Sequence, residues 1–436
     1  MPNLSHVPLA LQNLLSETAS QAGAASGFVQ RSSKLTPEIF VKTLTFGWLA
    51  NPSATLQQLA QTAALFGLDI SAQALDQRFC HRAASFLKQV LEAAVEQVFA
   101  SDPVAIPLLR RFKSVELIDT SIICLPDELL AVYSGCGGTS GKSSSLKLEL
   151  GLELITGRLK GPHLHDGRTA DCRGLLPRSS LEPGSLRLCD LAYFNLGWLK
   201  ELSGKRIYWI TRVKACTGIV DQGGKQWKLL DFIRAQGSDR IEVEVNLGFR
   251  EQVSCRLIAQ RVSKAVADRR RRRLRDKARR NCSRISKQSL ALAEWTVIAT
   301  NVEADKLSAD EAMVITRVRW QIELLFKLFK SQGRVDEWRS KKPWRILCEV
   351  YAKLLAMLIQ HWILVMSSWG YADRSILKAG KVVQMLAWPL AMAVKSAGEM
   401  LRVIRVAKKL IAGTCRINKR RKAPSSFQLL LDDALA

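Results

Sequence analysis

The chain has 436 residues, 47% of them hydrophobic, and a formal net charge of +26. This length exceeds one ordinary hydrophobic core and predicts two to four domains, and the hydrophobic content excludes a wholly disordered protein. So large a positive charge predicts a polyanionic partner, with nucleic acid the first expectation and an anionic membrane surface the second.

Cysteines and apolar stretches indicate the compartment. The ten cysteines are scattered singly, without a CxxC pair, which favours reduced thiols of a cytosolic protein over zinc ligands or disulfides. The N-terminus lacks the basic segment and apolar run of a signal peptide. The most apolar stretch, Leu354–Trp369, is interrupted by Gln360 and His361, so we expect a buried helix and no membrane association.

The N-terminal quarter reads as helical. Residues 1–36 are polar and rich in small residues, which predicts a flexible arm, and residues 37–112 have a helical pattern. Within this domain a helix over Ala54–Phe66 is followed by a turn at Gly67–Ser71 and a second helix beginning near Ala72. The polar residues expected on the second helix are Gln73, Asp76, Gln77, Arg78 and His81. This outline is typical of a helix-turn-helix and predicts a DNA-binding domain.

A strand pattern begins at Lys113. The expected strands are Val115–Leu125, Leu146–Ile155, Arg158–Leu164, Leu186–Asp190 and Arg206–Val213, with a short helix at Asn195–Leu202 before the last. Three hairpin-connected strands, a crossover, a strand, a helix and a strand are the order of an RNase H-like α/β fold with a mixed sheet. We assign 113–216 and 295–343 to this core. The Gly/Ser-rich region Gly135–Ser145 has the wrong spacing for a nucleotide-binding P-loop.

Residues 217–294 interrupt the core as an inserted β-rich basic subdomain. Lys225–Ile233, Ile241–Leu247 and Glu251–Ile258 are strand-like. Asp268–Arg280 carries eight arginines and one lysine, which is compatible with a solvated helix or a disordered linker but favours contact with phosphates. The predicted DNA-binding arginines of this block are Arg270, Arg271, Arg272 and Arg273. Residues 344–436 read as a C-terminal helical domain.

The second part of the core begins with an expected strand at Trp295–Asn301. The segment Val314–Lys330 follows it and predicts one amphipathic helix. Ser308 is a candidate N-cap, with Glu311 completing a capping box. A charged stripe beside the apolar face consists of Arg319, Glu323, Lys327 and Lys330. Arginine ahead of glutamate at this spacing is the less favourable order for a simple surface ion pair, so the stripe favours a site that binds metal ions and phosphate together.

Three acids stand where such a site needs them. Asp119 and Asp190 end apolar runs at the first and fourth strands, which are neighbours in an RNase H-like sheet, and Glu323 lies within the helix. Adjacent carboxylates repel each other unless cations neutralise them, and two Mg²⁺ (or Mn²⁺) ions about 3.5–4 Å apart would do so and activate an attacking oxygen. The competing acids are Asp102, Asp127, Asp166 and Asp171. His163 and His165 have no partner at zinc spacing and read as loop histidines.

These residues together resemble the DDE transposases of bacterial insertion sequences, in particular the IS-four-type group. The matching segments are IDTS at Ile118–Ser121, CDLAYFN at Cys189–Asn195 and RWQIELLFKLFK at Arg319–Lys330. The third is similar to the group's Y-(2)-R-(3)-E-(6)-K signature at Arg319, Glu323 and Lys330. Thr316 stands where that signature has tyrosine, and Ala192 where the second motif usually has glycine.

The resemblance covers roughly residues 37–345. It implies a β-domain inserted into the RNase H-like fold, metal binding by Asp119, Asp190 and Glu323, and phosphate binding by basic residues of the helix. In relatives that cut DNA through a hairpin, a tryptophan opening the strand after the insertion stacks on a flipped base. Trp295 occupies that place here, where it could equally be a core aromatic.

The sequence therefore predicts a metal-dependent DNA transposase, cytoplasmic and associated with the bacterial nucleoid. Its expected partners are double-stranded DNA, as element ends and as target, and a second copy of the chain when bound to DNA. The alternative is a catalytically inactive transposase-derived DNA-binding protein or inhibitor.

Overall fold

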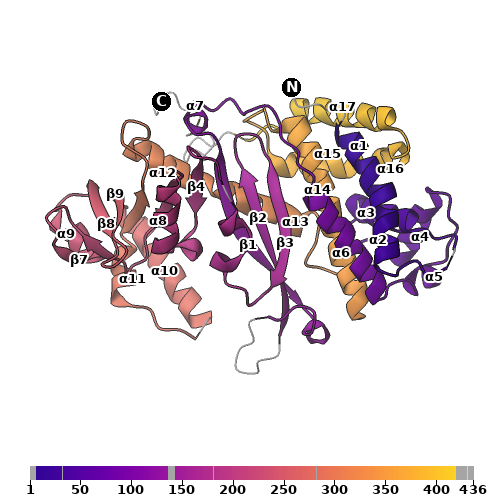
Figure 1. Cartoon of the computed structure of the whole chain (residues 1–436), viewed down its shortest axis with the longest axis horizontal. Helices are drawn as coiled ribbons and strands as arrows, with labels where there is room; N and C mark the ends of the chain where they lie inside the picture. The colour runs from indigo at the N-terminus through magenta and orange to yellow at the C-terminus, as the bar shows by residue number, and fades with distance from the viewer. Residues whose placement is uncertain are drawn as a thin grey trace. The chain divides into compact units, whose positions relative to one another are not determined.

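The computed structural model describes residues 6–31, 33–135, 143–179, 181–280, 282–418 and 430. They form two compact units, each assembled from separate chain segments (Figure 1). Unit 1 comprises Met1–Ile106, Asp119–Leu176 and Trp320–Ala423, and unit 2 comprises Pro107–Ile118, Pro177–Arg319 and Pro424–Ala436. Most of the predicted Gly/Ser-rich region at 135–145, and residues 419–429 and 431–436 of the predicted C-terminal helical domain, lie outside the described residues.

Ten strands form one mixed sheet in the order β3-β2-β1-β4-β5-β10-β9-β8-β6-β7. Their bounds are β1 Val115–Leu125, β2 Ser144–Glu153, β3 Leu159–Asp166, β4 Leu186–Cys189, β5 Tyr208–Arg212, β6 Gly218–Val220, β7 Gln226–Lys228, β8 Arg240–Leu247, β9 Val253–Arg261 and β10 Trp295–Thr300. β4 runs parallel to β1 and β5, whereas β2 pairs with β3, and β10 with β5, in antiparallel fashion. This order is consistent with an RNase H-like core and confirms the predicted fold class.

In unit 2 the inserted segment extends the core sheet, because β9 pairs with β10 along its length. The helices of this unit are α7 Pro107–Arg110, α8 Leu196–Gly204, α9 Leu229–Ala235, α10 Lys264–Arg280, α11 Lys287–Leu292 and α12 Ala309–Val318. Alternating residues of β8 and β9, including Val245, Leu247 and Leu257, pack with α8 and α9 in one hydrophobic core. The predicted strand Lys225–Ile233 is wrong beyond Lys228, where the apolar residues of α9 follow a helical period.

Unit 1 is mainly helical around the hairpin of β2 and β3. Its helices are α1 His6–Asn13, a π-helical turn Leu14–Thr18, α2 Ala19–Ala25, α3 Pro37–Ala50, α4 Leu56–Ala64, α5 Ala72–Asp76, α6 His81–Val95, α13 Trp320–Ser331, α14 Pro343–Ser368, α15 Ile376–Met385, α16 Ala387–Ala393 and α17 Ala397–Thr414. Short 3₁₀ turns lie at Asp127–Leu129, Asp171–Arg173, Leu176–Arg178 and, in unit 2, Leu191–Tyr193.

The expected N-terminal arm is helical over residues 6–25 instead. Val7, Leu11, Leu14 and Leu15 are buried, at the spacings of one helix face. This apolar stripe fixes the segment in unit 1, although the residues between are small and polar. The expectation of a flexible arm was therefore wrong for these residues.

The helix-turn-helix outline also requires correction. Thr55 caps α4 with a capping box, and Ser71, the last residue of the predicted turn, caps α5. However, α5 ends at Asp76, and the chain turns before α6 begins at His81. The expected second helix is thus a short helix and the start of another, so its polar residues do not share one helix face.

Helix α14 is the buried helix predicted around Leu354–Trp369. Among the described residues it is the one helix long and apolar enough to cross a bilayer, and its most apolar window is entirely buried in the protein. The Nε2 atom of its His361 lies 2.9 Å from the carbonyl oxygen of Gly157 in the β2–β3 turn. Gly157 has φ +76°, and a Cβ there would lie 2.4 Å from the Trp369 ring, so only glycine fits.

Candidate active site

Each of the two predicted aspartates follows a segment in which β1 and β4 are paired. β1 and β4 pair in parallel with Val115 opposite Leu186 and Leu117 opposite Leu188. Asp119 and Asp190 each follow the first of these pairs by four residues. Asp190 directly follows β4, which ends at Cys189, and precedes a 3₁₀ turn, so the strand end that the sequence predicted before Asp190 is present. Asp119, in contrast, lies within β1, which continues to Leu125, so it does not end that strand as the sequence predicted.

A buried ion pair stabilises that register. Glu116 of β1 lies directly opposite Arg187 of β4, and Glu116 Oε2 is 2.7 Å from a guanidinium nitrogen. Both side chains are almost fully buried, so breaking the pair by removing one partner would leave an uncompensated charge. A slip of β4 against β1 would separate these charges, which makes the observed register strongly preferred.

Arg319 contacts one of the predicted aspartates. Its Nε lies 3.6 Å from Asp190 Oδ1, with both side chains about a quarter exposed. Arg319 follows the last residue of α12 and keeps helical dihedral angles, but the helix is interrupted there and resumes as α13 at Trp320. The predicted single helix Val314–Lys330 is therefore two helices. Thr316 donates to the carbonyl of Ala312 within α12.

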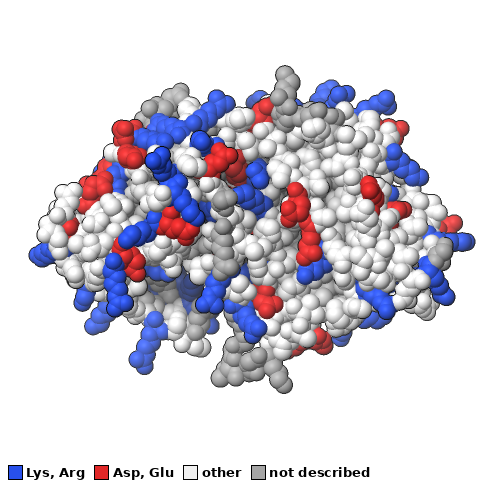
Figure 2. Space-filling model, in the orientation of Figure 1, with Lys and Arg blue, Asp and Glu red and all other residues white. Residues whose placement is uncertain are grey.

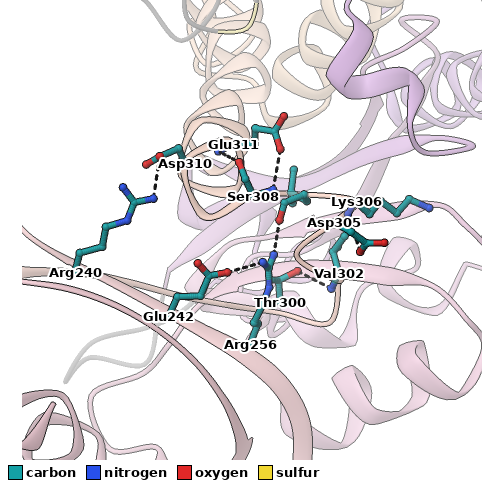
Figure 3. Close-up of polar contacts among 11 residues, drawn as sticks. Arg240, Glu242, Arg256, Thr300, Val302, Asp305, Lys306, Ser308, Asp310 and Glu311 are labelled. Atoms are coloured by element: carbon teal, nitrogen blue, oxygen red, sulfur yellow. Dashed lines mark hydrogen bonds and ion pairs between the residues drawn. The ribbon is translucent and has the colours of Figure 1, made fainter. Parts of the chain in front are cut away.

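The start of α12 is anchored to the inserted strands of unit 2 (Figure 3). Arg256 of β9 donates to Glu242 Oε1 and to the carbonyl of Leu307, each at 2.6 Å. Arg240 of β8 reaches Asp310 at 2.8 Å. Ser308 and Glu311 form the predicted capping box. The insertion thus fixes the entry of the helix that leads to Arg319.

Arg111, which follows α7, strengthens this cap. Its guanidinium lies 2.8 Å from Glu311 Oε1. Burial alone would raise the pKa of Glu311, but hydrogen bonds from Arg111 and Ser308 hold that pKa below its ordinary value. The carboxylate therefore stays ionised as the cap requires at neutral pH.

Glu323 and its basic neighbours lie on α13 in unit 1. Lys327 is exposed, and Glu323 and Lys330 are half-buried. Lys330 Nζ donates to the carbonyl of Ile122 at 2.8 Å, which ties α13 to the strand that carries Asp119. The sequence reading missed Trp320, which is 55% exposed on the same helix three residues before Glu323. Its exposure is unusual for so large an apolar ring and could have been suspected from its place beside the charged stripe.

A polar network lies beside Asp119. Asp119 Oδ1 accepts the amide proton of Thr120, whose hydroxyl donates to Asp171 Oδ1 at 2.9 Å. Lys147 of β2 lies 2.7 Å from the same Asp171 oxygen and also donates to the carbonyl of Thr169. Asp171 thus anchors a loop to β1 and β2. These contacts explain the Asp171 carboxylate without a bound metal ion.

The remaining competing acids and the two histidines have structural contacts or lie exposed. His165 pairs with the buried Glu149 at 3.0 Å, and burial lowers the pKa of His163. Asp166 accepts from the amide of Ser134 and lies near Arg168. Asp102 and Asp127 are exposed.

Carboxylate oxygens are the donors that Mg²⁺ prefers, so the chemistry of the three predicted acids fits such an ion. Among the residues that the structure describes, however, no three His, Cys, Asp or Glu side chains are grouped closely enough to hold a metal ion. The fit of the three acids to a metal ion therefore rests on their donor chemistry.

Comparison with known proteins identifies the family. Residues 111–359, more than half of the chain, match the transposase DDE domain. The chain belongs to the DDE transposase family. It is 26% identical over 316 residues to the transposase for insertion sequence element IS231F of Bacillus thuringiensis subsp. israelensis, covering 68% of this chain and 66% of that one. It is 24% identical over 366 residues to the transposase for insertion sequence element IS1151 of Clostridium perfringens, covering 78% and 76%.

Within this DDE transposase chain, the arginine block forms helix α10, and its arginines divide into two groups. Arg270 donates to the carbonyl of Trp295 and to Thr296, and Arg271 donates to the carbonyl of Leu290 and pairs with Asp268 and Glu294. These two arginines dock the helix. The exposed cations of the helix are Lys264, Arg269, Arg272, Arg273, Arg275, Lys277, Arg279 and Arg280. Figure 2 shows Lys and Arg side chains projecting from the unit that carries α10.

Trp295 opens β10 as expected for the strand after the insertion. It is half-buried against the hydrophobic core of unit 2, and the Arg261 guanidinium lies 6.0 Å from its ring centre. The core contact agrees with one of the two interpretations from the sequence, that of a core aromatic.

Proposed function

We propose that this chain is a transposase of the IS-four-type group that binds the ends of an insertion sequence, cleaves DNA and joins strands to a target. The observation that carries the proposal is the match of residues 111–359 to the transposase DDE domain, in a chain where Asp119 and Asp190 each follow the paired residues of β1 and β4. The chain spans about two thirds of the IS231F transposase, so activity of the whole protein is part of the proposal.

Asp119, Asp190 and Glu323 would hold two Mg²⁺ or Mn²⁺ ions. Such ions, when bound, lower the pKa of a water or 3′-hydroxyl and neutralise charge on a phosphodiester. Arg319 compensates Asp190 in the DNA-free chain, at 3.6 Å, and is placed to turn to a phosphate once cations take over that role. The sequence similarity to the group's signature supports this assignment of Arg319, Glu323 and Lys330.

Lys327 and Lys330 differ in what they can do for DNA. Lys327 is exposed on α13 and can contact a phosphate directly. Lys330 already donates to Ile122, so in this proposal it holds α13 against β1 and contributes positive potential to the site. Stabilisation of developing charge by fixed cations is the larger part of phosphoryl-transfer catalysis.

DNA outside the reacting phosphates would be held by α10. Its exposed Arg272 and Arg273 are assigned to phosphates, whereas Arg270 and Arg271 act by docking the helix. Trp295 is assigned to stacking on an extruded base, the step that a hairpin route of cleavage requires. Two copies of the chain would hold the two element ends, and the reaction would take place in the cytoplasm on nucleoid DNA.

The test is cleavage of DNA carrying the flanking element ends, with Mg²⁺, by the wild-type chain beside Asp190→Ala. Cutting at the ends by the wild type alone supports the proposal, and a hairpin product identifies the route. Sequence-specific binding without cutting, in both Mg²⁺ and Mn²⁺, would instead support an inactive DNA-binding protein. Equal cutting by both chains would reject Asp190 as a metal ligand.

A further inference from the structure

A second basic surface lies within unit 1, away from the acids and from α10 in the sequence. It joins two short segments, residues 76–82 at the corner of α5 and α6 and residues 339–345 at the start of α14. Together these segments contain six Lys and Arg residues and one acid. An ordinary solvated surface carries charges of both signs interspersed, so this excess of positive charge stands out. We refer to residues 76–82 and 339–345 as the corner surface.

The single acid of the corner surface joins the two segments. Asp76 lies 2.6 Å from Lys342 Nζ and 2.8 Å from an Arg345 guanidinium nitrogen. The hydrogen bond from Lys342 is the main reason that the pKa of Asp76 lies below its ordinary value. Arg345 also stacks over the Phe79 ring, at 5.6 Å. The arrangement is therefore built by specific contacts that hold both segments together.

The remaining cations of the corner surface point to solvent. Arg78, Arg82, Arg339 and Lys341 are all exposed. Among them stands Trp344, 39% exposed, whose ring meets the exposed His81 edge-on at 5.8 Å. The corner surface thus combines exposed cations with an apolar ring, and a nucleic-acid backbone offers matching phosphates and apolar sugar faces.

We propose that the corner surface binds the phosphate backbone of duplex DNA, with Trp344 packed against the sugars. This inference rests on the proposed transposase function and assigns the DNA contact of the N-terminal helices to the end of α5, the start of α6 and the start of α14. It replaces a recognition helix, because α5 has five residues and its Asp76 is engaged with Lys342 and Arg345. Backbone contacts position DNA without reading its sequence.

The salt dependence of DNA binding separates the contribution of the cations from that of Trp344. Removing one cation that neutralises a duplex phosphate reduces the magnitude of the negative slope of log affinity against log salt by about 0.9. The full-length chain would be titrated onto a labelled duplex carrying an element end, by fluorescence anisotropy over a series of KCl concentrations. The triple variant Arg78→Ala, Arg82→Ala, Lys341→Ala should reduce the magnitude of this slope by up to about 2.7. Trp344→Ala should weaken binding with the slope unchanged, since it removes no charge.

A matched control removes three exposed cations from α17, as Arg402→Ala, Arg405→Ala, Lys409→Ala. Equal slope changes in the two triple variants, or no change in the corner variant, would overturn the inference. Lys341→Glu repeats the test with one surface substitution that leaves packing intact. Wild-type cutting with an unaffected corner variant would reject this inference alone, whereas a wild type that neither binds nor cuts would reject the proposed function.

Discussion

Replacing Arg256 with methionine should destabilise unit 2 by about 2–3 kcal/mol. The Arg256 side chain is 4% exposed and makes two 2.6 Å hydrogen bonds, to Glu242 and to the carbonyl of the fully buried Leu307. Hydrogen bonds to charged groups contribute about 1.5–3 kcal/mol each. Methionine keeps the apolar packing made by the aliphatic part of the Arg256 side chain. Water can hydrate Glu242, which is 37% exposed, so the loss of stability is smaller than that from breaking a wholly buried ion pair.

The assay is urea unfolding at equilibrium, followed by far-ultraviolet circular dichroism and by tryptophan fluorescence to check that both probes report one transition. Arg240→Met is the matched control, because Arg240 lies on the neighbouring strand and pairs with Asp310 in solvent. An exposed pair of this kind contributes within about 1 kcal/mol. Equal effects of the two substitutions, or a loss below about 1 kcal/mol for Arg256→Met, would refute the argument that the buried guanidinium anchors α12.

Two further predictions concern unit 1. Burial lowers the pKa of His361 to about 4 from 6.5, so the unfolded chain binds a proton first and stability should fall by about 3 kcal/mol as pH drops from about 6.5 to 4. In His361→Gln this part of the pH dependence should disappear from urea titrations, and its persistence would assign it elsewhere. Lys147→Met should lower the DNA cleavage rate about tenfold with affinity for DNA little changed, because it loosens Asp171 and Thr120 beside Asp119. A matching loss of affinity would show a binding role instead.

The strands β1 and β4 were predictable because each contains an apolar run followed by an acid. That pattern placed Asp190 correctly after the end of β4, whereas β1 continues past Asp119 to Leu125. The capping box at Ser308 and Glu311 is likewise a local signal with a fixed spacing. The antiparallel pairing of β2 with β3 was also predictable, because a short turn connects the two strands.

The remaining features depend on tertiary contacts. Short apolar runs do not distinguish strand from helix, and α9 was misread for that reason. The sequence shows eight arginines in one block, but it does not show that Arg270 and Arg271 bind residues 290–296, which come later in the chain. The break at Arg319 has no glycine or proline to announce it. The anchoring role of Arg256 requires the pairing of β8 with β9, which no local pattern specifies.

The central claim is that Asp119, Asp190 and Glu323 act as one metal site. The most direct test is Mn²⁺ binding to the full-length chain bound to element-end DNA, measured by electron paramagnetic resonance for the wild type and for Asp119→Asn, Asp190→Asn and Glu323→Gln. The account predicts two bound ions in the wild type and loss of at least one in each variant, with DNA affinity retained. Wild-type stoichiometry in all three variants would contradict it.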